Sequence, residues 1–258
     1  MKRTSIVFLM LASLISVTTQ ASNKIIKIGT DATFPPFEST APDGTIVGFE
    51  VDLGNAICAE MNRKCVWVPF SFDGLILGLK GRKLDAVFSS LGITEKRRRQ
   101  VDFTDVIWSG FSSMLSKKSA QLKPTIESLK GKVVGVQIGT MQESYVSQRL
   151  GEYGVKVKTY QDQDSVYADL LSGRIDASFQ DMIQAQFTFI NEGKHSDFSN
   201  QKFEDESLPS DSAVAIRKND KEMAHVFNEG LKRIHANGVY DKIQRKYFGD
   251  LVLYSKGK

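Results

Sequence analysis

The chain is poor in the residue types that build metal and redox centres. Its 258 residues include two cysteines and three histidines, and the histidines lie far from the cysteines in the sequence. Cys58 and Cys65 are too far apart for the CxxC pattern of thiol redox proteins and do not match a zinc motif. The sequence therefore predicts no metal site and no cofactor. In an oxidising compartment we expect the two cysteines to form a structural disulfide.

Charge of one sign is not in excess either. Lys and Arg number 34 and Asp and Glu 30, which gives a formal charge of +4 with histidine neutral. Two of these positive charges belong to Lys2 and Arg3, at the start of the chain. A balance so near neutrality provides no steering field for an acidic polymer, so we expect no nucleic-acid partner.

Beyond the first residues the chain has no long apolar run. The run Ile6 to Val17 is short for a membrane helix, follows two basic residues and precedes the small-residue pattern Thr19-Gln20-Ala21. We expect residues 1–21 to be a secretory signal peptide that is cut after Ala21, with an uncleaved anchor as the alternative. No cysteine follows the run, so we expect no lipid anchor and an exported, soluble mature protein.

Two pairs of segments resemble each other. GRKLDAVFSS at residues 81–90 matches GRIDASFQD at 173–181, and IIKIGT at 25–30 matches VVGVQIGT at 133–140. The chain is therefore interpreted as two related α/β modules in tandem. Two such modules that face each other form a cleft lined by polar groups at strand ends.

Segments typical of strands and helices alternate along the chain, which favours an α/β fold with mostly parallel sheets flanked by helices. The predicted strands are 25–29, 65–69, 85–89, 133–137, 155–160, 176–179 and 212–216. The predicted helices are 51–61, 72–79, 93–100, 141–150, 165–171, 182–191, 222–237 and 240–247. Residues 107–115 and 208–213 look extended, so two crossing strands should join a first lobe (22–110 and 208–258) to a second lobe (111–207).

Charged residues at the predicted strand ends are candidates for binding. Asp31, Glu50 and Asp181 are acids at strand or turn edges, and Arg97 lies at a helix start where it could bind a carboxylate through two hydrogen bonds. The glycine of Ile138-Gly139-Thr140 precedes a helix, a place that favours an anion. The alternatives are surface acids, a solvated basic face and a plain helix cap by the threonine.

Taken together, these segments identify the chain as similar to a known family. It resembles the periplasmic substrate-binding proteins for polar amino acids of ABC importers, which include the lysine/arginine/ornithine, histidine and arginine binders (bacterial solute-binding protein family 3). The resemblance covers about residues 25–248. It rests on IGTDATFPPFE, GFEVDLGNAICAEM, SFDGLILGLKGRKLDA, SSLGITEKRRRQVDFT, LKGKVVGVQIGT, LLSGRIDASFQD and NGVYDKIQRKYF. It implies the two-lobed fold of periplasmic binding proteins and a location in the periplasm.

The resemblance also implies roles for single residues. Arg97 would hold the α-carboxylate of the ligand, with backbone N–H groups near Gly92 and Thr140, and Asp181 would take the α-ammonium. Asp31, with Glu50 and Ser89, would face the far end of the ligand side chain. The complete set of implied ligand-binding residues is Asp31, Phe34, Glu50, Phe72, Ser89, Ser90, Gly92, Arg97, Thr140, Met141, Gln142 and Asp181. Of these, Phe34 and Phe72 would sandwich the ligand side chain, although both could equally belong to the core.

Three of these positions depart from the family pattern. Gly92 replaces a serine, Phe34 a tyrosine and Met141 a threonine, which affects the rank order of ligands. The charges support a basic ligand independently, because one guanidinium and three carboxylates leave about two negative charges near the ligand side chain once an α-amino acid is bound. We expect arginine to bind best, then lysine and ornithine, then histidine.

Two other functions compete with this one. Secreted cyclohexadienyl dehydratases resemble these binders and use the cleft for an elimination reaction, but an acidic pocket disfavours a dicarboxylate substrate. A ligand-loaded partner of a separate receptor is the second alternative. The expected protein is thus not an enzyme but a monomer that binds a free basic L-amino acid and delivers it to the permease subunits of an inner-membrane ABC importer.

Overall fold

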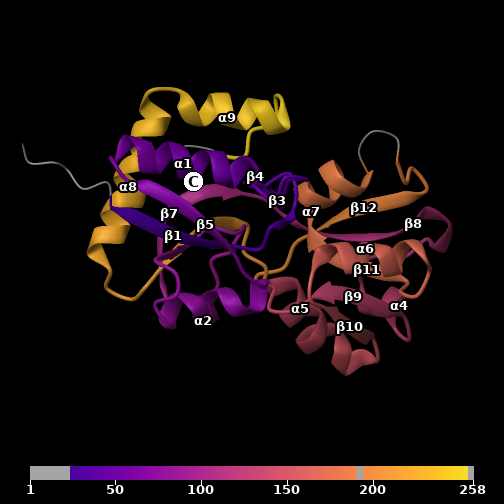
Figure 1. Ribbon diagram of the computed structural model, residues 1–258. Coiled ribbons are helices and arrows are strands. Elements are labelled where there is room, and N and C mark those ends of the chain that lie inside the picture. Colours follow the sequence, from indigo (N-terminus) through magenta and orange to yellow (C-terminus); the bar gives the residue numbers. More distant parts are fainter. Residues whose placement is uncertain (1–23, 191–193, 255–258) are drawn as a thin grey trace, which may run out of the picture.

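Two five-stranded sheets, each flanked by helices, form the two halves of the molecule (Figure 1). Figure 1 shows the computed structural model, which describes residues 24–190 and 194–254. The first sheet has the order β5 (Lys64–Pro69), β1 (Ile25–Thr30), β6 (Ala86–Val87), β13 (Asp211–Ile216) and β7 (Asp102–Ser109). The second has the order β10 (Lys156–Tyr160), β9 (Val133–Gln137), β11 (Ala177–Asp181), β8 (Ser112–Lys117) and β12 (Phe198–Phe203). We call the halves built on these sheets the first and the second lobe.

The two sheets have the same pattern of strand directions, although the fourth strand comes last along the chain in the first sheet (β13) and first in the second (β8). In each, the first three strands pair in parallel and the fourth pairs antiparallel with both of its neighbours. The repeated sequences occupy equivalent places, because β1 and β9 are the second strands and β6 and β11 the third. The predicted fold of two mostly parallel sheets is confirmed, with β13 and β8 as the strands that run against the others.

The lobes are joined where the chain crosses from one sheet to the other. Residues 107–115, predicted as one extended run, form the end of β7 and the start of β8, which belong to different sheets and are separated by Gly110 and Phe111. The chain returns between β12, which the sequence did not predict, and β13. The predicted lobe boundaries after residues 110 and 207 stay a proposal. The predicted signal peptide lies outside the described residues.

Helices cover both faces of the sheets (Figure 1). Those of the first lobe are α1 (Phe49–Glu60), α2 (Leu75–Lys80), α3 (Glu95–Arg98), α8 (Lys221–Ala236) and α9 (Val239–Phe248). Those of the second lobe are α4 (Ile126–Leu129), α5 (Met141–Tyr145), α6 (Gln163–Leu171) and α7 (Met182–Gln184). The predicted helices 141–150 and 182–191 begin as α-helix and then widen into π-type turns over Val146–Leu150 and Ala185–Ile190.

The last helices of the chain close the first lobe. Asp220 caps α8 by accepting a hydrogen bond from Met223 N at 3.2 Å. The apolar face of α8 is buried, and Gly230 lets it approach α1 so closely that a Cβ atom there would lie 2.7 Å from Ile57. Burial of apolar surface of this kind is the main source of stability. Helix α1, from the first part of the described chain, therefore packs against α8 and α9 from its last part (Figure 1).

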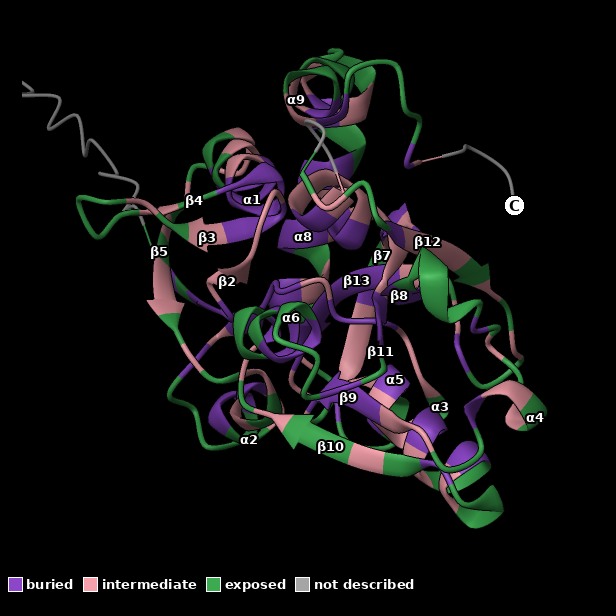
Figure 2. Cartoon of the chain, turned by 90° about the vertical axis from the view of Figure 1, so that its right-hand side faces the viewer, coloured by how far each residue is buried: buried purple, intermediate pink, exposed green. Residues whose placement is uncertain are grey.

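Each lobe has its own apolar core. An aromatic cluster of Phe37, Phe49, Trp108 and Phe248 fills the first, with the rings of Phe37 and Trp108 stacked at 4.4 Å. In the second lobe β9 is largely buried, whereas the edge strand β10 is mostly exposed (Figure 2). Short strands form a third sheet beside the first core: β2 (Thr33–Phe34), β3 (Glu38–Thr40) and β4 (Ile46–Val47). A turn that contains Asp43 and Gly44 joins β3 to β4.

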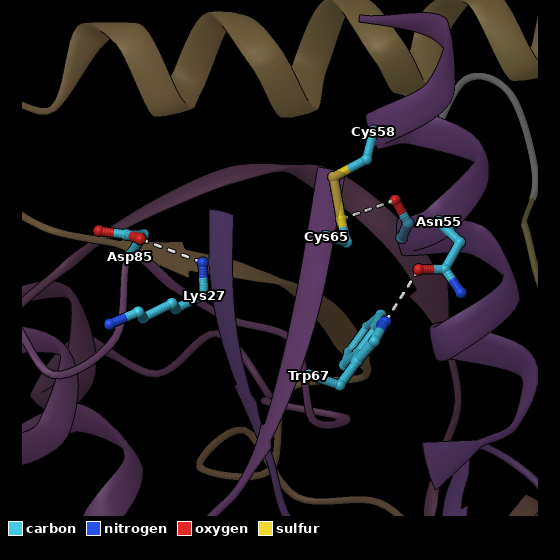
Figure 3. Close-up of a disulfide and its surroundings, with 7 residues drawn as sticks. Lys27, Asn55, Cys58, Cys65, Trp67 and Asp85 are labelled. Atoms are coloured by element: carbon cyan, nitrogen blue, oxygen red, sulfur yellow. Dashed lines mark hydrogen bonds between the residues drawn. A yellow bond between two sulfur atoms is a disulfide. The ribbon is translucent and has the colours of Figure 1, made fainter. Parts of the chain in front are cut away.

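A disulfide ties α1 to β5 (Figure 3). Cys58, in the last turns of α1, is bonded to Cys65 on the edge strand, which confirms the predicted pair. Next to it, Trp67 Nε1 on β5 donates a hydrogen bond to Asn55 Oδ1 on α1 at 2.9 Å. These two links hold the helix against an edge strand that has only one neighbour in the sheet.

Candidate ligand-binding cleft

A cleft lies between the lobes, at the carboxyl ends of the parallel strands. Asp31 follows β1, Ser89 and Ser90 follow β6, and Asp181 ends β11. The empty space in the cleft is about 660 Å³, a figure that includes open solvent at its mouth. Ligands bind at this edge of α/β sheets because polar side chains and free backbone groups meet there.

Arg97 enters the cleft from α3 of the first lobe. Thr94 caps this helix and accepts a hydrogen bond from Arg97 N at 3.2 Å. One guanidinium nitrogen of Arg97 donates to Gly92 O at 2.7 Å and the other to Gly139 O at 3.1 Å, while the ring of Phe72 lies 5.4 Å from the guanidinium carbon. Burial lowers the pKa of Arg97 to about 10, so the group stays charged at neutral pH. No acid of the described residues forms an ion pair with it, which leaves it able to bind an anion.

The start of α5 faces Arg97 from the second lobe. Thr140 caps α5 by accepting a hydrogen bond from Glu143 N at 3.0 Å, as the alternative interpretation of this residue expected, and it also lines the cleft. A Cβ atom on Gly92 would lie 2.9 Å from Met141 Sδ, so the glycine makes room for the methionine. Two of the departures from the family pattern, Gly92 and Met141, are therefore in contact across the cleft. Gln142 is buried and donates to Ser112 Oγ at 2.9 Å.

Asp181 lies opposite, at the end of β11. Its Oδ1 accepts a hydrogen bond from Gln184 N at 2.8 Å, so it also caps the short helix α7. Burial raises the pKa of Asp181 to about 7, in spite of the backbone hydrogen bonds that favour its charged form. A cation bound in the cleft would favour ionisation of this carboxyl group.

Asp31 links the lobes at another part of the cleft. Its Oδ1 accepts from Thr33 Oγ1 at 2.9 Å, and its Oδ2 accepts from Gln137 Nε2 of the second lobe at 2.6 Å. Burial raises the pKa of Asp31, and the negative charges of Asp162 and Asp164 add to this effect. This carboxyl group is therefore costly to ionise when no cation is nearby.

Glu50 does not line the cleft. Its carboxyl group lies behind Ser90 and accepts hydrogen bonds from Trp108 Nε1 at 2.6 Å and Ser90 N at 2.7 Å. The position of Glu50 thus does not support its predicted contact with a ligand, and that contact stays a prediction. Glu38, on β3, lines the cleft instead. Like the other predicted acids, Glu38 lies at the edge of a strand next to a turn, but the sequence did not predict it as a binding residue.

The remaining predicted residues gather at the same cleft. Phe34 and Phe72, from the first lobe, both line it, as do Ser89 and Ser90. Ser90 has a left-handed backbone (φ 47°), a conformation that is uncommon for a residue other than glycine. The structure therefore brings together every predicted ligand-binding residue except Glu50. Lining residues that the sequence did not predict include Trp108, Gln137, Gln163, Phe179, Gln180 and Ser212.

The lobes are in direct contact around the cleft. Hydrogen bonds cross from Arg97 to Gly139, from Gln137 to Asp31 and from Thr188 Oγ1 to Pro35 O, the last at 2.6 Å. This arrangement is a closed one, in which side chains of both lobes surround a small space. The fold and the cleft define the class of the protein: a two-lobed binding protein with a cleft between the lobes that is lined by charged residues.

Comparison with known proteins gives the family. Residues 26–250 match the family model of the bacterial extracellular solute-binding proteins, family 3. The chain is 40% identical over 248 residues to the lysine/arginine/ornithine-binding periplasmic protein of Escherichia coli (strain K12), covering 93% of this chain and 95% of the other. It is 39% identical to the L-arginine-binding protein of Pseudomonas aeruginosa, over 96% of this chain and 97% of the other. The chain belongs to the family 3 bacterial extracellular solute-binding proteins.

A solved structure agrees with this membership. An ancestral arginine-binding protein bound to arginine superimposes with a TM-score of 0.81 at 34% sequence identity, over 87% of this chain and 98% of the other. The predicted resemblance to the periplasmic binders of basic amino acids is confirmed, as is the predicted location, the periplasm. Of the helices in the described part of the chain, none combines the length and the apolar character that crossing a membrane requires.

Proposed function

We propose that the protein is the substrate-binding component of an ABC importer and that it captures a basic L-amino acid in the cleft by closure of the two lobes. The preferred ligand is arginine, followed by lysine and ornithine, and then histidine. In this proposal Arg97 holds the α-carboxylate and Asp181 the α-ammonium. Phe34 and Phe72 pack on the aliphatic part of the ligand side chain, and its charged end meets Asp31.

The charge of the cleft is the observation that carries this proposal. Among the described residues that line it are three acids, Asp31, Glu38 and Asp181, and one basic residue, Arg97. The α-carboxylate and α-ammonium of any amino acid would use Arg97 and Asp181, which leaves two buried acids for the ligand side chain. Burial of unpaired acids is costly, and a cationic side chain relieves that cost, whereas an acidic one adds to it.

Relatives support the same ligand class. The curated relatives named above bind lysine, arginine and ornithine, or L-arginine, according to their names, and the solved relative holds arginine. In this proposal the loaded protein is a monomer that delivers its ligand to membrane permease subunits and catalyses no reaction. Incubation with prephenate or arogenate tests the last point, because formation of phenylpyruvate or phenylalanine would instead mean a dehydratase.

Isothermal titration calorimetry of the mature protein tests the ligand class. The ligands are L-arginine, L-lysine, L-ornithine, L-histidine, L-glutamine and L-glutamate. We expect dissociation constants on the order of micromolar or below for arginine, which corresponds to about −8 kcal/mol or better. Tightest binding of glutamine or glutamate would contradict the proposal.

A further inference from the structure

Two buried glutamates, Glu38 on β3 and Glu50 on α1, lie together behind the serines that end β6. Ser90 Oγ lies 3.4 Å from Glu38 Oε2 and 3.3 Å from Glu50 Oε1, so one hydroxyl group lies between the two carboxyl groups. Each side chain is about 1% exposed. Two carboxylates this close and this buried cannot both be charged at neutral pH without a cation beside them, so the pair holds a proton.

The hydrogen bonds show which glutamate holds the proton. Glu50 accepts two N–H groups, from Trp108 at 2.6 Å and from the Ser90 backbone at 2.7 Å, and such donors stabilise a carboxylate. Glu38 has only hydroxyl partners, at 3.2 Å from Ser89 and 3.4 Å from Ser90. The charge therefore resides on Glu50 and the proton on Glu38, which is the member of the pair that lines the cleft.

The surroundings favour the same distribution. Burial raises the pKa of Glu38, and the negative charges of Glu50 and of Asp31, which follows β1, raise it further. Burial raises the pKa of the Tyr240 hydroxyl group on α9, and the negative charge of Glu50 contributes to this effect. The neighbouring β6 and β7 contribute the donors Ser89, Ser90 and Trp108. Among the described residues no Lys, Arg or His forms an ion pair or a hydrogen bond with either glutamate.

We propose that Glu38 is a specificity-determining residue that contacts the ligand side chain and releases its proton to solvent when a cationic side chain binds. The step is a simple exchange: the O–H bond of Glu38 breaks, the proton passes to water, and the resulting carboxylate pairs with the ligand cation. A neutral side chain with a carbonyl oxygen would instead leave the proton in place and accept a hydrogen bond from it. This inference rests on the proposed function and names the group that distinguishes cationic from neutral side chains.

The test compares L-arginine with L-citrulline, in which an uncharged urea group replaces the guanidinium. Calorimetry at pH 7 in buffers of different ionisation enthalpy gives the number of protons released with each ligand. Both ligands carry the same α-ammonium and α-carboxylate, so a proton released at Asp181 is common to both and cancels. We expect arginine to release up to about one proton more than citrulline, and the difference to disappear at high pH, where Glu38 is already ionised.

Variants assign the proton to Glu38. Glu38→Gln should weaken arginine binding by at least about tenfold, leave citrulline binding nearly unchanged, and abolish the difference in proton release. Glu50→Gln should reduce the difference, because loss of the Glu50 charge lowers the pKa of Glu38 and favours its ionisation in the free protein. Glu222→Gln, at an exposed glutamate on α8, is the control and should behave as the parent in both measurements.

The outcomes separate this inference from the proposed function. If the parent binds no basic amino acid, both the proposed function and the proposed role of Glu38 are wrong. If the parent binds arginine but releases as many protons with citrulline, only the role of Glu38 is wrong. The role of Glu38 is also wrong if Glu38→Gln keeps the parent's ratio of arginine affinity to citrulline affinity. The result with Glu38→Gln is used only if its thermal melting, followed by circular dichroism, is cooperative. Otherwise the results with Glu50→Gln and the parent decide whether Glu38 has the proposed role.

Discussion

Three consecutive arginines show how much the position of a single residue matters. Arg97 is buried in the cleft between the lobes, with its guanidinium bonded to two backbone carbonyl oxygens. Arg98 and Arg99 are exposed, and Arg98 lies 3.8 Å from Glu95 on the surface of α3. The sequence pattern distinguishes them only by context, since Arg97 is the one nearest the strand end. Because Arg97 is buried in the cleft, its charged guanidinium group can be satisfied by a bound carboxylate.

Replacement of Arg97 tests its proposed role. We expect Arg97→Ala to weaken binding of every amino acid by about 3–5 kcal/mol, or at least a hundredfold, because it leaves the α-carboxylate of the ligand buried without a partner. Calorimetry with arginine, lysine and histidine measures the loss, and Arg99→Ala serves as the control. If Arg97→Ala binds arginine as well as the parent does, its role in holding the carboxylate is wrong.

At the scale of elements, the turn between β9 and α5 sets how closely the lobes approach. Gly139 has φ +79°, and a Cβ atom there would lie 2.9 Å from the Cα atom of Asp73 in the first lobe. Backbone atoms cannot move aside as a flexible side chain can. The turn therefore requires glycine for two reasons, its conformation and its contact with the other lobe.

Gly139→Ala separates these two reasons when it is compared with Gly173→Ala. Gly173 has φ +74° with nothing within 4 Å of an added Cβ, so its replacement introduces the conformational strain without the contact. Urea unfolding should show a loss of about 1 kcal/mol or more for both variants. Only Gly139→Ala should weaken arginine binding, by about tenfold or more, because the closed state becomes less populated. Equal binding by the two variants would mean that the turn does not limit closure.

The disulfide between α1 and β5 acts at the same scale. The chain-entropy model gives about 2.5 kcal/mol for a loop this short, so Cys58→Ser with Cys65→Ser should lower the free energy of unfolding by roughly that amount. Arginine affinity should change little, because the bond lies away from the residues that line the cleft. Urea unfolding measures the loss. Mass spectrometry after alkylation should find both thiols blocked in periplasmic protein, and free thiols there would contradict the prediction.

For the whole molecule, the buried acids of the cleft make stability depend on pH. Burial raises the pKa of Glu50 and of Asp181 to about 7, above the value of either group in an unfolded chain. Between the unfolded and the folded pKa the folded state binds more protons, so these groups stabilise the protein at low pH and the contribution is lost as pH rises to 7. In the proposed complex the α-ammonium of arginine pairs with ionised Asp181, which opposes the effect at that group.

Thermal melting from pH 5 to pH 8 checks this linkage. Without ligand, we expect the melting temperature of the parent to fall as the pH rises through this range. The fall should be smaller in Asp181→Asn, which has no acid to ionise at that position. Acids whose pKa is lowered by ion pairs, such as Asp169, titrate below this window and do not disturb the measurement. A ligand-free melting temperature that rises steadily up to pH 8 would contradict the prediction.

Local patterns were sufficient for much of the architecture. The repeated runs that became β1 and β9, and β6 and β11, are apolar segments whose burial depends mainly on their own composition, so their pairing as equivalent strands followed from the sequence. The disulfide followed from there being two cysteines. Arg97 and Asp181 were found because the carboxyl end of a strand is a recognisable place in an α/β fold.

The split of residues 107–115 between two sheets, and the position of β12, depended on tertiary contacts. So did the choice between Glu38 and Glu50. Both are acids near turns, and only the packing of α1 against Trp108 and Ser90 directs the Glu50 carboxyl group away from the cleft. Side-chain direction depends on contacts between segments far apart in the sequence, which a linear pattern does not contain. The sequence by itself therefore determined the class of protein and the charge of its site, and the tertiary structure decided which of these two acids lines the cleft.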